Sequence, residues 1–146
     1  GTIADPLEGF DIVPTVPVVV TETEADRDYG YAAVSAYAAL YIGGMGSREK
    51  NFYNQLACRM GFEKEAALVQ DLYLDGRARD AAAAVPRAFL DATALIGSRD
   101  QIRDRLGAYA AAGVTTLSVA ATAPSLNRRR ATLRVMAELL AESGLG

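Results

Sequence analysis

A run of nine apolar or β-branched residues, from Ile12 to Val20, is the feature that most constrains the fold of this chain. Polar and apolar side chains do not alternate along it, so we expect both faces of the segment to be buried. Such a pattern is typical of a strand inside a parallel sheet. Pro14 and Pro17 each lack an N–H group. We therefore expect the early part of this strand to be irregular or to lie at a sheet edge.

Two shorter apolar segments, each followed by a helical pattern, come later in the chain. Residues 93–98 (TALIGS) and 114–120 (VTTLSVA) predict strands, and the amphipathic segments after them predict helices. Further helical segments lie between the first two strands, and we expect the first of these to begin with a capping box from Thr21 to Glu24. The resulting order predicts an α/β fold with parallel strands and right-handed crossovers.

Three parallel strands are few for a complete fold of this class. The 146 residues suit one domain, spanning 1–146, or one piece of a domain. Doubly wound α/β sheets have about five or six strands and a (β/α)₈ barrel has eight. Because a sheet of three strands leaves exposed edges that something must cover, the pattern predicts a larger partner sheet.

Charge and composition exclude several classes of partner. The net charge is −3 and the pI about 5.0, which argues against nucleic acid, because phosphate binding needs a concentrated positive face. The longest apolar stretch, 31–45, is shorter than the roughly 20 residues of a membrane helix, so we expect no membrane partner. Cys58 has no second cysteine to pair with, so we expect a reducing, cytoplasmic location.

The chain contains no histidine, which restricts the chemistry that it can perform. A Ser-His-Asp triad and a Cys-His pair are both excluded. A zinc site would have to be built from carboxylates and one thiol, which is an unusual ligand set. We therefore expect no metal ligand in this chain and no catalytic residue of a type that depends on histidine.

A glycine-rich segment, YIGGMGSREKNFY at residues 41–53, has two interpretations. Its spacing matches neither a phosphate loop nor a dinucleotide fingerprint, and it follows a helix rather than a strand. A helix–helix connector in which Ser47 caps the next helix would explain it without a ligand. A ligand-binding loop is the alternative.

Two further segments follow predicted strands. Gly97-Ser98 lies at the carboxyl end of a strand and opens a helix, where parallel α/β folds bind ligands, although Ser98 also suits a helix N-cap. Arg128, Arg129 and Arg130 stand near a helix N-terminus, where the helix dipole disfavours cations. An anionic ligand, a salt-bridged partner or a solvated helix face would each explain these arginines.

Three stretches together resemble a known family: GFDIVPTVPVVVTETEAD, LYIGGMGSREKNFYNQLACRMGFEKEAALVQDLYLDG and AAAAVPRAFLDATALIGSRDQIRDRLGAYAAAGVTTLSVA. The chain resembles the C-terminal part of luciferase-like oxidoreductases, and most closely the subgroup that uses a deazaflavin coenzyme. The resemblance covers nearly the whole chain. YIGGMGSREKNFYNQLACRMG is its more subgroup-specific part, whereas the strand–Gly-Ser–helix–AAGVTTL–strand segment is typical of the whole superfamily.

The resemblance implies a specific fold. Family members form (β/α)₈ TIM barrels more than twice as long as this chain. Residues 10–20, 93–97 and 115–120 would then be the last three barrel strands, with extra helices between the first two of them. The chain would be the C-terminal portion of the barrel, and its missing N-terminal half would be its main partner.

The resemblance also implies a function. The whole enzyme would transfer a hydride between a small organic substrate and a coenzyme of the 8-hydroxy-5-deazaflavin type. One alternative is an FMN-dependent luciferase-like monooxygenase. The other is a non-catalytic α/β fragment or a binding or assembly module, for example one of flavodoxin-like topology. We expect this chain alone neither to bind the coenzyme tightly nor to turn over, and we expect it to form a homo-oligomer.

The resemblance places candidate coenzyme-binding residues in two groups. The first lies where the strands end and comprises Thr21, Gly97, Ser98 and Thr122. The second lies in the glycine-rich segment and comprises Tyr41, Met45, Lys50 and Asn51. The second group joins the first only if the chain reverses at Gly30, because an unbroken helix over 22–42, about 30 Å long, would carry the segment to the far face.

Overall fold

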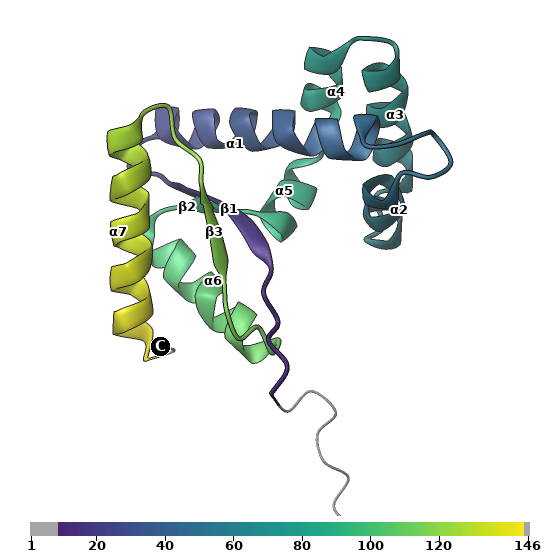
Figure 1. Cartoon of the computed structure of the whole chain (residues 1–146). Coiled ribbons are helices and arrows are strands. Elements are labelled where there is room, and N and C mark those ends of the chain that lie inside the picture. Colours follow the sequence, from purple (N-terminus) through teal and green to yellow (C-terminus); the bar gives the residue numbers. More distant parts are fainter. Residues whose placement is uncertain (1–8, 145–146) are drawn as a thin grey trace, which may run out of the picture.

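The computed structural model describes residues 9–144 and contains three parallel β-strands surrounded by helices (Figure 1). The strands are β1 (Thr15–Val20), β2 (Leu95–Gly97) and β3 (Ser118–Ala121). The helices are α1 (Glu24–Ala39), its π-helical continuation η1 (Leu40–Gly44), α2 (Phe52–Arg59), α3 (Glu63–Leu74), α4 (Ala78–Ala84), α5 (Arg87–Thr93), α6 (Arg99–Ala111) and α7 (Leu126–Ser143). The predicted α/β class, the three parallel strands and the extra helices between the first two strands are confirmed.

The strand order in the sheet is β2-β1-β3. Successive strands of a (β/α)₈ barrel pair in chain order, so β2 would lie in the middle of three barrel strands. The observed order differs: it is the order found at one end of a doubly wound, flavodoxin-like sheet. The lengths of the strands supply a physical reason. β2 has three residues, whereas β3 pairs with four residues of β1, from Thr15 to Val18.

Pro17 lies inside this central strand, although its missing N–H group led us to expect an edge or an irregular segment. The peptide groups that face β3 belong to the even-numbered residues, because the Pro14 and Val18 carbonyls accept from the Ser118 and Thr122 N–H groups. Pro17 therefore faces β2, and β2 pairs with β1 only from Val18 onward. The proline removes no ladder hydrogen bond in this sheet.

Helices cover both faces of the sheet. One face packs Val19 and Ile96 against α1 and the helices that follow it. The other face packs Val16, Val18 and Leu95 against α6 and α7. A right-handed crossover that returns across β1 places α6 on the face opposite α1, as observed. The absence of polar alternation in Ile12–Val20 therefore has the cause that we predicted, since both faces of β1 are buried.

Gly30 does not reverse the chain. Helix α1 is continuous from Glu24 to Ala39 and is prolonged by η1 to Gly44. A Cβ atom at Gly30 would lie 3.0 Å from side-chain carbons of Val19 and Ile96. This glycine lets the helix backbone lie close against the sheet.

The far end of α1 carries a separate group of helices, α2, α3 and α4 (Figure 1). Their close packing explains two glycines of the glycine-rich segment. A Cβ atom at Gly43 or at Gly44 would lie less than 3 Å from the side chain of Tyr73 on α3. These two glycines serve the packing of η1 against α3.

Candidate functional site

The three strands bring Thr21, Gly97 and Thr122 to one edge of the sheet. The Thr21 N–H group donates to the Gly97 carbonyl over 2.8 Å, and the Thr122 N–H group donates to the Val18 carbonyl over 3.0 Å. This edge is the carboxyl-terminal end of the sheet, because all three strands are parallel and end there. The shared position of these residues is as we predicted, and their contact with a coenzyme stays a prediction.

A groove of about 230 Å³ opens at this edge, between the first turns of α1 and α7. It lies beside the ends of β1 and β3, which is the switch point of the strand order, where open α/β sheets bind ligands. Thr122 is the one member of the first predicted group that lines it. The lining residues are Val19, Val20, Glu22, Asp26, Tyr29, Thr122, Ala123, Pro124, Arg128, Ala131, Thr132 and Val135.

An ion pair between Asp26 and Arg128 crosses this groove. Arg128 Nη1 lies 2.5 Å from Asp26 Oδ1, and the carboxylate side chain is only 11% exposed. The hydrogen bond from Arg128 and those from Thr23 and the Glu22 N–H group lower the pKa of Asp26 from 3.8 to about 2. Of the three explanations for the arginine run, a salt-bridged partner therefore holds for Arg128.

The same aspartate completes the N-terminal cap of α1. Thr23, and not Thr21 as we predicted, is the N-cap: its hydroxyl accepts from the Asp26 N–H group over 3.1 Å, and Asp26 Oδ2 accepts from the Thr23 N–H group. Thr21 is buried, and its N–H group extends the pairing of β1 with β2. The carboxylate that caps the helix is thus also the one that holds Arg128.

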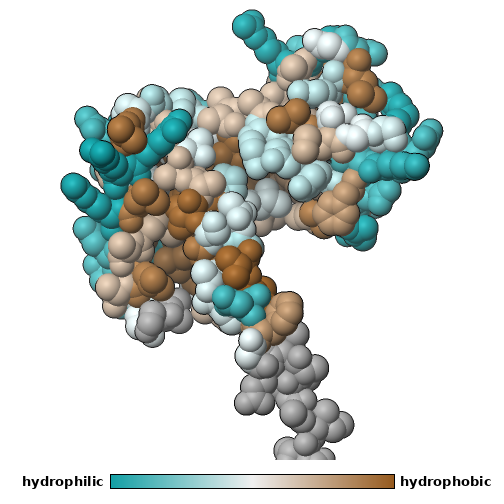
Figure 2. Space-filling view, viewed as in Figure 1, coloured by the Kyte–Doolittle hydropathy of each residue, from teal (hydrophilic) through white to brown (hydrophobic). Residues whose placement is uncertain are grey.

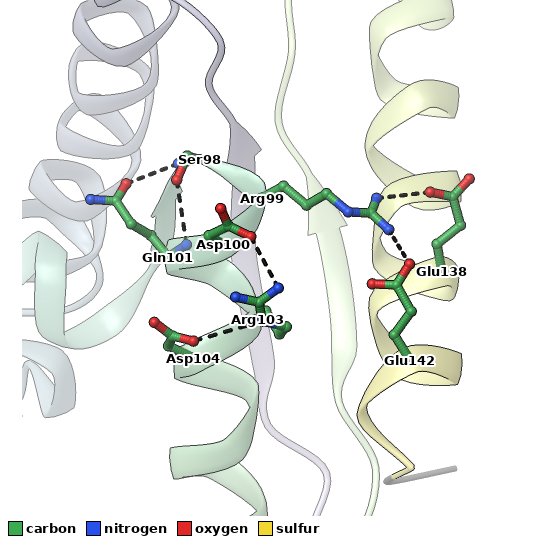
Figure 3. Close-up of polar contacts among 8 residues, drawn as sticks. All are labelled: Ser98, Arg99, Asp100, Gln101, Arg103, Asp104, Glu138 and Glu142. Atoms are coloured by element: carbon green, nitrogen blue, oxygen red, sulfur yellow. Dashed lines mark hydrogen bonds and ion pairs between the residues drawn. The ribbon is translucent and has the colours of Figure 1, made fainter.

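Ser98 is the N-cap of α6 (Figure 3), and Gly97 directly before it is the last residue of β2. The Ser98 hydroxyl accepts from the Gln101 N–H group, and Gln101 Oε1 accepts from the Ser98 N–H group over 2.9 Å. A Cβ atom at Gly97 would lie 2.7 Å from Gln101 Oε1 and 3.2 Å from Gln101 Cβ, so a side chain there would displace the Gln101 carboxamide group from the cap. Neither residue lines the groove, and the capping role of Ser98 is observed.

Arg99 fixes α6 to α7, which supplies one wall of the groove (Figure 3). Its guanidinium group lies 2.8 Å from Glu138 and 2.7 Å from Glu142. Arg99 and both glutamates are at least one-third exposed, so solvent screens these ion pairs and each adds little to stability. Their main effect is to fix the relative orientation of the two helices.

The second predicted group lies at the other end of α1, away from the groove. Because the helix runs unbroken through the Gly30 position, Tyr41, Met45, Lys50 and Asn51 are not brought to the strand ends. Asn51 is 1% exposed and acts structurally. Its side-chain amide donates to the Tyr41 and Ile42 carbonyls over 2.9 Å and caps α2.

Tyr41 belongs to an aromatic cluster on the surface at this far end. Its ring lies 4.5 Å from that of Tyr37 and 4.6 Å from that of Tyr53, centroid to centroid. The hydrogen bond between Tyr37 and Tyr41, together with burial, raises the pKa of Tyr37 to about 12. Met45 and Lys50 are exposed nearby. The contact of this second group with a coenzyme stays a prediction. The structure does not favour it, because the group lies at the end of α1 away from the groove.

Sequence reasoning missed Asp26 and Tyr29 as groove residues. A signal for Asp26 exists, because it stands three residues after Thr23 and thus at the third helical position of a capping box. Its pairing with Arg128 spans 102 residues and leaves no local signal.

Two classes of site find no support within residues 9–144. No helix in that range is long and apolar enough to cross a membrane. The same range contains no cluster of three or more histidine, cysteine, aspartate or glutamate side chains that could hold a metal ion.

Comparison with known proteins adds to this geometry. A family model described as "Luciferase-like monooxygenase" matches residues 3–116. A protein of Mycobacterium tuberculosis (strain ATCC 25618 / H37Rv), named "putative coenzyme F420-dependent oxidoreductase", is 36% identical over 114 residues. No solved structure shows significant similarity to this chain.

These matches cover the two proteins unequally. The aligned segment is 78% of this chain but 32% of the M. tuberculosis protein, so the chain spans about a third of the length of that relative. The family match ends at residue 116, just before β3 begins at Ser118. The matched part therefore comprises β1, the helices after it, β2 and α6, whereas β3 and α7 lie beyond it.

Proposed function

The chain belongs to the luciferase-like monooxygenase family, and on this premise we propose that it forms part of an oxidoreductase that transfers a hydride between an organic substrate and a deazaflavin coenzyme. The observation that carries the proposal is the groove at the carboxyl ends of β1 and β3. In parallel α/β folds, both barrels and open sheets, this edge is the one that binds ligands. The name of the M. tuberculosis relative supports the choice of a deazaflavin.

The groove suits one part of such a coenzyme and not the whole of it. Its volume of about 230 Å³ lies below the range of about 300–1,000 Å³ that is usual for ligand pockets. The apolar part of its lining comes from Val19, Val20 and Val135, and Thr122 also lines it. We propose that this chain supplies one wall of a pocket whose other walls come from the rest of a longer protein.

The coenzyme and the residues of this wall would have different roles in the reaction. The coenzyme, when bound, supplies the carbon that accepts or donates the hydride. The valines of the groove would exclude water from one side of that carbon. The Asp26–Arg128 pair would hold the first turns of α1 and α7 at a fixed separation, because each residue lies in the first turns of its helix. No residue of this chain is assigned a proton transfer.

We propose a (β/α)₈ barrel, of which this chain would be the C-terminal portion, as the alternative architecture of the complete protein. In that barrel β3 leaves β1 and pairs with the outer edge of β2, so the groove between β1 and β3 and the Asp26–Arg128 pair would not form. An open groove of about 400 Å³ runs along that edge, lined in part by Ala94, Leu95 and Ile96. The outer edge of β1 would then be free to pair with the strand that precedes it in the barrel.

A chimera tests the proposed function. The M. tuberculosis relative is cut at the start of its 114-residue matching segment, and this whole chain takes the place of everything after the cut, so that β3 and α7 are included once. Coenzyme binding is followed by fluorescence titration with a deazaflavin and, separately, with FMN. We expect the chimera to bind the deazaflavin in the micromolar range or tighter and the isolated chain to bind neither compound. If the chimera binds FMN but not the deazaflavin, the coenzyme of the proposed enzyme is FMN.

Two substitutions in the chimera locate the site. Val135→Asp places a charge in the groove and is expected to weaken coenzyme binding about tenfold or more, because a carboxylate in an apolar wall must stay hydrated. Lys64→Ala, on the exposed surface of α3, is the matched control and should leave binding unchanged. Equal binding by both variants would remove the groove from the site.

A further inference from the structure

We draw no further inference here: the strongest candidate, the exposed apolar surface patch along α7 (Figure 2), which includes Leu126, Leu133 and Leu140, carries no proposal, because nothing in the structure shows what covers it and it lies on a side that the proposed longer protein would cover.

Discussion

Asp26 and Arg128 join the first turns of α1 and α7 through an ion pair of 2.5 Å, across the groove at the carboxyl ends of β1 and β3. The two residues lie 102 positions apart in the sequence. The carboxylate also caps α1 through Thr23. One side chain therefore fixes both the start of a helix and the separation of two groove walls.

This pair predicts a specific loss of stability in acid. The pKa of Asp26 is lowered from 3.8 to about 2 in the folded chain, so its contribution is fully present above about pH 4 and is lost as the pH falls toward 2. Asp26→Asn removes that contribution at every pH. Thermal melts followed by circular dichroism should show a deficit in Tm for the variant that is constant above about pH 5 and shrinks below pH 4.

Arg128→Ala is the companion variant for this experiment. It removes the first cause of the lowered pKa but leaves the hydrogen bonds from Thr23 and Glu22. The acid-dependent part of the Tm difference should therefore be smaller than for Asp26→Asn. A deficit of equal size at pH 7 and at pH 2 for Asp26→Asn would show that this carboxylate is not linked to acid stability.

Two glycines in helix interiors should respond to substitution with opposite signs. Gly107, in α6, has open space where a Cβ atom would lie, so Gly107→Ala should raise the free energy of unfolding by about 1 kcal/mol. Gly30, in α1, faces Val19 and Ile96 at 3.0 Å, so Gly30→Val should lower it by about 1–3 kcal/mol through overpacking. Urea denaturation measures both. A stabilised Gly30→Val would contradict the close approach of α1 to the sheet.

Local sequence predicted the elements well and their assembly poorly. The both-sided apolar run of β1 and the strand–helix alternation depend on neighbouring residues, so the α/β class and the parallel strands were predicted correctly. The strand order depends on which edge of the β1–β2 pair receives β3, and no residue near β3 encodes that choice. β1 offers β3 four paired positions, whereas β2 is only three residues long.

The candidate site shows the same limit. The segment TETEAD offers two capping boxes, Thr21 with Glu24 and Thr23 with Asp26, and both satisfy the local rule. A distant contact from Arg128 favours the second. A glycine at position 30 is likewise compatible with a break in the helix or with a close approach of the helix to the sheet. Only the packing of α1 against the sheet shows which of the two occurs.

Asn51 should behave as a structural residue and not as a surface ligand contact. Asn51→Ala removes the cap of α2 and a bond to the Tyr41 carbonyl at a position that is 1% exposed, so it should cost about 2–3 kcal/mol of stability. The adjacent exposed Lys50→Ala is the control and should change stability by less than about 0.5 kcal/mol. If urea denaturation shows that Asn51→Ala and Lys50→Ala lower the free energy of unfolding by equally small amounts, Asn51 has no structural role and is again a candidate ligand contact.

Tyr37 should ionise at unusually high pH because of its neighbour. Its pKa is raised to about 12, first through the hydrogen bond with Tyr41 and then through burial. Tyr41→Phe removes that hydrogen bond while keeping the ring, so the pKa of Tyr37 should fall toward 10.0. Tyr53→Phe is the matched control, because Tyr53 raises this pKa only through the weaker charge interaction. NMR titration of ¹³C-labelled tyrosine, with Tyr37→Phe to assign the signal, measures the change. An assigned Tyr37 signal that already titrates near pH 10 in the unsubstituted chain would show that the two hydroxyl groups are not hydrogen-bonded in solution.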